Sequence, residues 1–198
     1  MNEWEELKES LGLTPAKGYT PSPAFESLDR LIRVVRLQKG GALPEPPEPE
    51  VYLLYVGVLI CAVERAGGEA FIDNILWKPG TMYFDIHRVA GDACPVRKQV
   101  IAAEPAVLIA LPIAAVDAVN LEDAPLFRLY AKRHEENITD LRTHKNVLLC
   151  MSAPERYDWF LENYPGLIDR VQHRRIASFL NMTPVSLSRI RHAKRAKT

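Results

Sequence analysis

The stretch VQHRRIASFLNMTPVSLSRIRHAKR, residues 171–195, decides the fold of the C-terminal part of this chain. It contains two helical patterns joined by the short connection Asn181-Met182. The apolar or small positions that would pack between the two helices are Ile176, Ala177, Leu180, Met182, Leu187 and Ile190. Helical periodicity with so short a connection predicts a helix-turn-helix, the motif that places its second helix in the DNA major groove.

The residues of the connection favour this motif. Asn181 stands where the backbone is usually left-handed, and asparagine is the next best residue after glycine for that conformation. Thr183 can cap the N-terminus of the second helix, and Pro184 suits its first position. We therefore expect the turn and the helix start to follow the helix-turn-helix pattern.

The same end of the chain is strongly basic. Residues 170–198 contain eight Lys or Arg and no Asp or Glu, although the whole chain has 25 basic and 25 acidic residues. Residues 1–169 therefore hold 17 basic and 25 acidic residues. This asymmetry indicates a nucleic-acid-binding end on an acidic body, with a solvated basic tail as the plainer alternative.

Composition narrows the class of protein. The 198 residues suffice for one large domain or two small ones. The first ten residues are too polar for a signal peptide, and no apolar run approaches the length of a membrane span. Cys61, Cys94 and Cys150 lie far apart and form no metal-binding spacing. We expect a cytoplasmic protein with reduced thiols, no metal site and no membrane partner.

Helices and then short strands are expected before the basic end. Residues 1 to about 36 predict helices interrupted at 15–23, and the proline-rich segment 42–50 predicts a loop. Five β-rich runs follow, separated by Gly and Pro turn signals: 51–64, 69–77, 81–89, 98–104 and 106–112. This pattern predicts an antiparallel sandwich or barrel, with a hairpin turn at AGGE, residues 66–69.

A heptad pattern indicates a long helix after the strands. Its positions, which alternate in steps of four and three, are Phe127, Ala131, His134, Ile138, Leu141, Lys145 and Leu148. The stripe fits either a dimer seam or a helix that lies on its own β domain. Ser152 and Glu155 then form a capping-box pattern at the start of the next helix.

Two segments resemble the Crp/Fnr-type transcription regulators, in the form found in Bacteroidetes. They are ERYDWFLENYPGLIDRVQHRRIASFLNMTPVSLSRIR (155–191) and YLLYVGVLICAVERAGGEAFIDNILWKPG (52–80). The resemblance implies an α+β protein with an N-terminal, cyclic-nucleotide-binding-like double-stranded β-roll (jelly-roll-like) at residues 1–121. A dimerisation helix at 122–151 and an all-α helix-turn-helix domain at 152–198 would follow. The sequence given stops soon after the last helix, so we expect no full wing.

The resemblance also implies which residues face double-stranded DNA: Gln172, His173, Thr183, Ser186 and Arg189. Thr183 and Ser186 suit phosphate contacts at a helix N-terminus, and Arg189 suits a bidentate contact to guanine. His192 lies on the same exposed face of the predicted helix, whereas Lys194 suits the neutralisation of phosphates. Pro184 and Val185 replace family residues that often contact bases, so the operator cannot be read from the sequence.

The effector side departs from the cyclic-nucleotide pattern. The region after Pro79-Gly80 lacks the Gly-Glu pair, and Asp85 stands about where the ribose-binding Glu would be. Arg97 is one residue out of register with the phosphate-binding Arg, and a surface Arg is its plainer interpretation. We place a candidate effector pocket at Tyr83, Asp85 and Arg97, and we do not expect cyclic AMP as the ligand. Three scattered cysteines cannot supply the four ligands of an Fnr-type iron–sulfur cluster.

Three functions are considered for a chain with these features. The leading one is a homodimeric transcription regulator with an unknown small-molecule effector. The second is a ligand-binding sensor module without DNA-binding activity. The third, a cupin-like enzyme, needs several metal-binding histidines, and the β region offers only His87. No nucleophile–base set or phosphate loop stands out, so we expect neither an enzyme nor a cofactor.

Overall fold

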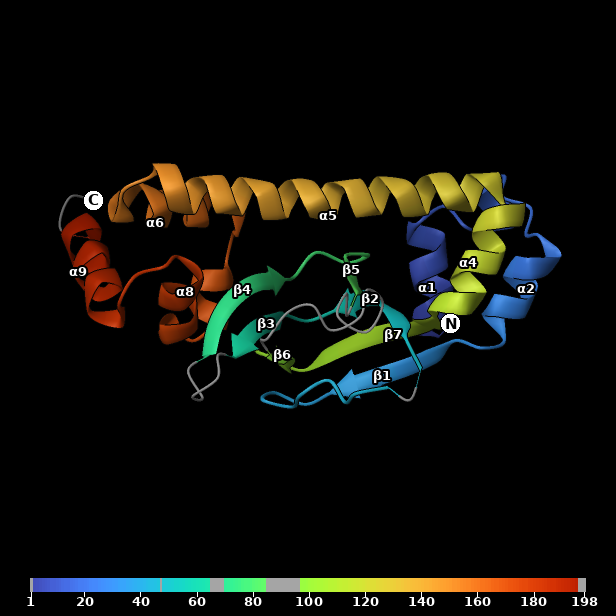
Figure 1. Cartoon of the computed structure of the whole chain (residues 1–198), viewed down its shortest axis with the longest axis horizontal. Coiled ribbons are helices and arrows are strands. Elements are labelled where there is room, and N and C mark those ends of the chain that lie inside the picture. The colour runs from blue at the N-terminus through green and yellow to red at the C-terminus, as the bar shows by residue number, and fades with distance from the viewer. Residues whose placement is uncertain (1, 47, 65–69, 85–96, 196–198) are drawn as a thin grey trace.

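One long helix, α5 (Ala124–Cys150), runs the length of the molecule and joins its two ends (Figure 1). The structure, a computed structural model, describes residues 2–46, 48–64, 70–84 and 97–195. At the beginning of α5 lie α1 (Glu3–Ser10), the short 3-10 helix at Pro15–Lys17, α2 (Pro23–Asp29) and α4 (Ile113–Glu122). At its end lie α6 (Ala153–Asn163), α7 (Leu167–Arg170), α8 (His173–Phe179) and α9 (Pro184–Arg195).

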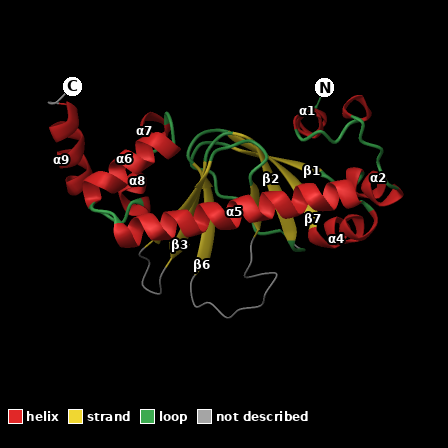
Figure 2. Ribbon diagram, turned by 90° about the horizontal axis from the view of Figure 1, so that it is seen from above, coloured by secondary structure: helices red, strands yellow, loops and turns green. Residues whose placement is uncertain are grey.

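Two antiparallel sheets pack beneath α5 (Figure 2). The first has the order β1 (Arg33–Leu37), β7 (Ala106–Pro112), β2 (Glu50–Val56) and β5 (Met82–Phe84). The second has the order β4 (Ala70–Leu76), β3 (Leu59–Glu64) and β6 (Arg97–Ala102). Every described strand pair is antiparallel, which confirms the α+β architecture with an antiparallel β domain. The predicted hairpin turn at 66–69 lies outside the described residues.

One expectation for the N-terminal part is wrong. Helix was predicted to about residue 36, but α2 ends at Asp29 and residues 33–37 form strand β1. Val34 and Val35, two β-branched residues, pair with Ile109 and Leu108 of β7. The apolar positions 28, 31 and 32 have helical spacing. Pairing with the edge of β7 nevertheless stabilises residues 33–37 as a strand.

Strand β2 is buried on both faces, and its side chains alternate between two cores. Val51 and Leu53 face the N-terminal helices, where they join a cluster with Trp4 and Phe25. Tyr52 and Leu54 point the other way, into the space between the two sheets. The period-two alternation of a strand therefore explains why VYLL is apolar at every position.

Strand β3 shows the same alternation, but its second face is covered by the C-terminal helices. Leu59 and Cys61 lie between the sheets, whereas Ile60 packs with Phe160 and Leu180. The helix-turn-helix region and the β domain thus share one buried cluster. Figure 1 shows α8 beside the β3–β4 end of the sheet.

Gly57, which joins β2 to β3, is required by geometry. Its φ is +107°, a conformation that residues with a side chain rarely adopt. A Cβ there would lie 2.6 Å from the Ala106 Cβ and 2.7 Å from the Pro105 carbonyl oxygen. This close approach lets β3 leave the first sheet and enter the second.

The start of α5 is fixed by a buried polar contact. Asp123 caps the helix by accepting a hydrogen bond from the Leu126 N–H at 2.9 Å, and it also accepts one from the Tyr19 hydroxyl at 2.6 Å. Tyr19 stacks edge-on against Phe25 of α2. The N-terminal segment is therefore anchored to the long helix. No described helix is long and apolar enough to cross a membrane.

Candidate nucleic-acid interface

Helices α8 and α9 form the predicted helix-turn-helix. Asn181 has a φ of +49°, so the left-handed turn predicted at this residue is confirmed. The Met182 N–H donates to the Ala177 carbonyl at 2.9 Å and closes the turn. Thr183 caps α9, because its hydroxyl accepts a hydrogen bond from the Ser186 N–H at 3.1 Å. Helix α9 begins at Pro184, as expected.

One face of α9 is buried and the opposite face is open. Leu187 is 1% exposed and packs against Ile176 and Ala177 of α8, both fully buried. The exposed residues spaced for a single stripe on the other side of the helix are Val185, Ser188, Arg189 and His192. We call these four residues the α9 stripe. Neither α8 nor α9 contains an acidic residue, so the stripe is suited to a polyanion.

Arg189 is the most available base-reading candidate. Its side chain is exposed, and it makes no hydrogen bond or ion pair within the described part of the chain. Lys194 differs, because its ammonium pairs with Asp158 of α6. Its predicted role as a phosphate neutraliser would therefore require a contact already made within the chain to be shared or released.

The other predicted contact residues lie near the starts of α8 and α9. Gln172 and His173 are exposed at the start of α8. The Arg191 guanidinium approaches the His173 ring, with Nη1 2.9 Å from Nδ1, and so links α9 to α8. Thr183 and Ser186 hydrogen-bond each other at 2.9 Å between their hydroxyl oxygens. These two hydroxyls would keep this contact or exchange it for phosphate oxygens.

Two side chains outside the motif hold its turn, and sequence analysis did not identify them. His144 of α5 donates from Nε2 to the Phe179 carbonyl at 2.8 Å. Arg156 of α6 donates from Nη1 to the Leu180 carbonyl at 2.8 Å and to the Asn181 carbonyl at 3.1 Å. These bonds satisfy the last carbonyls of α8, which have no partner within the helix.

A side chain within the motif contacts the β domain: the Ser178 hydroxyl of α8 accepts a hydrogen bond from the Ile72 N–H of β4 at 3.0 Å. Strand β4 is an edge strand, so this contact caps part of the sheet's open edge. Arg170 adds a two-atom ion pair with Glu104, beside the end of β6. The orientation of the helix-turn-helix on the β domain is therefore fixed by both polar and apolar contacts.

His144 is also packed between aromatic rings. It is 7% exposed, and its ring stacks on Phe179 with 3.9 Å between centroids and on Trp159 with 5.9 Å. Burial lowers the pKa of His144, against the opposing effects of the Phe179 carbonyl and of Asp73. The neutral imidazole therefore carries its proton on Nε2, where the carbonyl accepts it. The sequence signal that could have identified His144 is a histidine just outside the heptad stripe.

The heptad stripe of α5 is largely exposed, although part of it borders the β domain. Leu126, Leu129 and Tyr130 pack against the N-terminal core, and Val147 is buried near the other end of the helix. By contrast Phe127 is 48% exposed, Ile138 37% and Leu141 42%. The helix thus has a buried stripe and an exposed stripe, and Ile138 and Leu141 of the exposed stripe also line a cavity between α5 and the second sheet.

A cavity of about 330 Å³ lies between the second sheet and α5. Its lining includes Cys61, Asp73, Tyr83, Lys98, Tyr130 and His134, and we call it the sheet cavity. Of the predicted effector residues, Tyr83 lines it, Asp85 lies outside the described residues, and Arg97 is described only through its backbone, which pairs with Glu64. His87 also lies outside the described residues.

The chemistry of the sheet cavity is mixed. Asp73 and Lys98 approach to 3.8 Å, and burial raises the pKa of the Asp73 carboxyl although Lys98 opposes this. Asp73 Oδ1 is buried without a hydrogen-bond partner among the described residues. Burial also raises the pKa of the Cys61 thiol, so this thiol is protonated at neutral pH. The described residues form no group of three metal-binding side chains.

Comparisons with known proteins identify the fold. No protein-family model and no curated protein sequence matches the chain. A CooA variant from Carboxydothermus hydrogenoformans is 17% identical with a TM-score of 0.66, covering 90% of this chain and 86% of that one. A protein from Eubacterium rectale assigned to the Crp/Fnr family of transcriptional regulators is 12% identical with a TM-score of 0.65, covering 93% and 88%.

The c-di-GMP responsive global regulator CLP of Xanthomonas campestris is also similar. It is 11% identical with a TM-score of 0.64, and the match covers 88% of this chain and 91% of that one. The likeness extends over the β domain, the long helix and the C-terminal helices, because it covers most of each chain. The chain therefore has the fold of the Crp/Fnr-family regulators.

Proposed function

We propose that this chain is a transcription regulator of the Crp/Fnr type that binds duplex DNA in the cytoplasm and is not an enzyme. The observation that carries the proposal is the α9 stripe. It is exposed, free of acidic residues, and presented by a helix-turn-helix whose turn is held by His144 and Arg156. Rigid presentation matters because base recognition needs side chains held in register with the groove.

The chain would act as a homodimer. Two copies would pair through the exposed heptad stripe of α5 and place their α9 helices in successive major grooves, roughly 34 Å apart. The exposed apolar residues Phe127, Ile138 and Leu141 support this pairing, because single exposed stripes of this kind usually have a partner.

An effector, if the protein has one, would bind in the sheet cavity. Strand residues and α5 residues line the cavity together, so a ligand there would contact the β domain and the dimer helix at once. A ligand that favours one arrangement of these two elements would change the spacing of the α9 helices.

Arg189→Ala tests the DNA-reading role. A binding site is first selected from a pool of random duplexes. We expect the variant to bind this site about 10–100-fold more weakly, because a bidentate base contact contributes about 1–3 kcal/mol. Binding to unrelated duplex should change by less than about threefold, since phosphate contacts dominate there. Gel-shift titrations at fixed salt measure both affinities.

Arg128→Gln is the matched control, because it removes an exposed charge at the far end of α5. It should leave both affinities unchanged. Unaltered specific binding by Arg189→Ala would contradict the assignment of the α9 stripe. If the wild-type protein shows no salt-dependent binding to any duplex, the alternative of a sensor module without DNA-binding activity holds.

Cyclic AMP should not stabilise the protein. The half-buried Asp73 carboxyl in the sheet cavity would oppose a cyclic phosphate, and the Gly-Glu pair of cyclic-nucleotide binders is missing. We expect no rise in melting temperature with cyclic AMP at about 1 mM, a concentration that would stabilise a micromolar binder by several kcal/mol. A saturable rise in a thermal-shift titration would contradict this expectation.

A further inference from the structure

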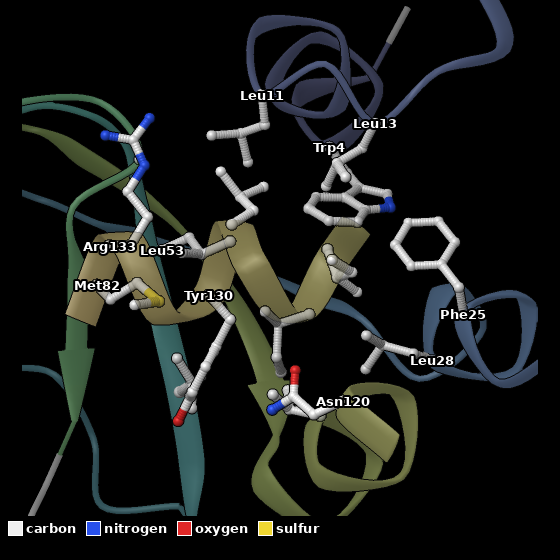
Figure 3. Close-up of a pocket in the computed structure, with 16 residues that line it drawn as sticks. Trp4, Leu11, Leu13, Phe25, Leu28, Leu53, Met82, Asn120, Tyr130 and Arg133 are labelled. Atoms are coloured by element: carbon white, nitrogen blue, oxygen red, sulfur yellow. The ribbon is translucent and has the colours of Figure 1, made fainter. Parts of the chain in front are cut away.

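A second cavity lies at the other end of the molecule, between the N-terminal helices and the beginning of α5 (Figure 3). Its lining comes from α1, α2, α4, α5 and the first sheet, and is almost entirely apolar. The apolar residues of the lining include Trp4, Leu11, Phe25, Leu28, Leu53 and Val116. We call it the N-terminal cavity. Its volume is about 60 Å³, which is room for several water-sized groups and for a small organic molecule if side chains adjust.

Two buried polar atoms of the lining side chains lack a partner within the described part of the chain. They are Arg133 Nε and Asn120 Oδ1, which have no hydrogen-bond partner among the described residues. Figure 3 shows Arg133 beside Leu11 at one end of the cavity and Asn120 at the other end. Buried polar atoms are nearly always paired in folded proteins, so both atoms indicate a missing partner.

The free side of Arg133 has a defined geometry. Nη1 donates to Glu136 Oε2 at 3.0 Å, on the exposed side of α5. Nη2 lies over Gly80, where a Cβ would be 3.7 Å from Nη2 and 3.4 Å from Leu11 Cδ2. The edge formed by Nε and Nη2 is therefore the one that Glu136 does not use. Two parallel N–H donors on one edge match the two oxygens of a carboxylate.

We propose that the N-terminal cavity binds a small apolar monocarboxylic acid. Its carboxylate accepts hydrogen bonds from Arg133, and its hydrocarbon part lies among Leu11, Leu53 and Trp4. An apolar lining with one placed charge is the usual design of a site for such a ligand. A water molecule or a ligand hydroxyl satisfies Asn120, whereas a carboxylate accepts from both donors on the edge of Arg133 that Glu136 does not use.

An occupied cavity would tie the N-terminal helices to α5. Met82 and Tyr130 line both the N-terminal cavity and the sheet cavity. The proposal is independent of DNA binding, so its failure would leave the proposed function unaffected.

Hexanoate and hexanamide are the probes, because they have nearly the same shape and differ in charge. Methyl and indole N–H signals of the full-length protein are followed by NMR during titration with each probe. Trp4 is an internal reporter, since its ring lines the cavity and its indole N–H donates to Asp29. We expect saturable shifts confined to the lining residues, with a dissociation constant for hexanoate of roughly 1 mM, as suits a ligand of this size.

Hexanamide should bind at least about tenfold more weakly, because it gives up the charge-assisted pair with Arg133. Arg133→Gln should weaken hexanoate binding about tenfold and leave hexanamide unchanged, and Arg128→Gln, the exposed charge on the same helix, should change neither. The proposal is wrong if hexanoate shifts no lining residue, if the two probes bind equally to the wild-type protein, or if Arg133→Gln leaves the hexanoate affinity unchanged.

Discussion

Replacing Phe179 by alanine should lower the free energy of unfolding by about 3–5 kcal/mol, the range for a large aromatic side chain removed from a closed core. Phe179 is fully buried at the end of α8. The rings that surround it, with centroids between 3.9 and 6.4 Å away, belong to His144, Trp159, Phe160 and Tyr164. These rings come from α5 and from α6 with its C-cap, so the surrounding structure cannot easily close the cavity that is left.

The destabilisation should affect the β domain as well, because one buried cluster joins it to the C-terminal helices. Phe179 belongs to the same buried group as Val58, Ile60 and Ile75 of the β domain. We therefore expect one cooperative transition in denaturant, shifted to a lower midpoint, with a slope close to that of the wild-type protein. Far-ultraviolet circular dichroism and tryptophan fluorescence should report the same midpoint.

Phe71→Ala is the matched control, because Phe71 lies on β4 and is 46% exposed. It should cost less than about 1 kcal/mol. A loss below about 1 kcal/mol for Phe179→Ala would mean that the contact between α8 and the aromatic rings is absent in solution. Two separated transitions in the wild-type protein would contradict the shared cluster.

The parts of the fold that could be predicted from sequence are those set by neighbours in the chain. The turn at Asn181 and the cap at Thr183 depend on local backbone conformation and local hydrogen bonds, and both are confirmed. The same holds for Ser152, whose N–H and hydroxyl donate to the Glu155 carboxylate at 2.8 and 2.6 Å. Local stereochemistry leaves a readable signal because few residue types satisfy it.

The parts that could not be predicted depend on partners distant in sequence. Strand β1 forms because β7 offers an edge more than seventy residues later, and residues 31–36 carry no trace of that pairing. The roles of His144 and Arg156 as donors to the turn depend on how α5 and α6 pack against α8. The apolar character of Ile60 was visible, but nothing local shows that the C-terminal helices cover it.

Replacing Ile138 by glutamate should convert the proposed dimer into a monomer. Ile138 lies at the middle of the exposed stripe of α5, where a two-fold seam would bring both copies of the residue together. Two facing carboxylates would be buried without partners, which weakens association at least about 100-fold, equivalent to about 2.7 kcal/mol. Because Ile138 is already 37% exposed in the single chain, the fold of each copy should tolerate the change.

Sedimentation equilibrium measures the association, and thermal unfolding checks that each copy still folds. Thr139→Glu is the matched control, since Thr139 is the next residue of α5, is exposed and lies off the stripe. It should leave the dimer intact. A duplex with two half-sites should then distinguish the variants, because a monomer gains nothing from the second half-site. A wild-type protein that is monomeric at concentrations of about 100 μM, or a dimer that survives Ile138→Glu, would exclude the exposed stripe as the seam.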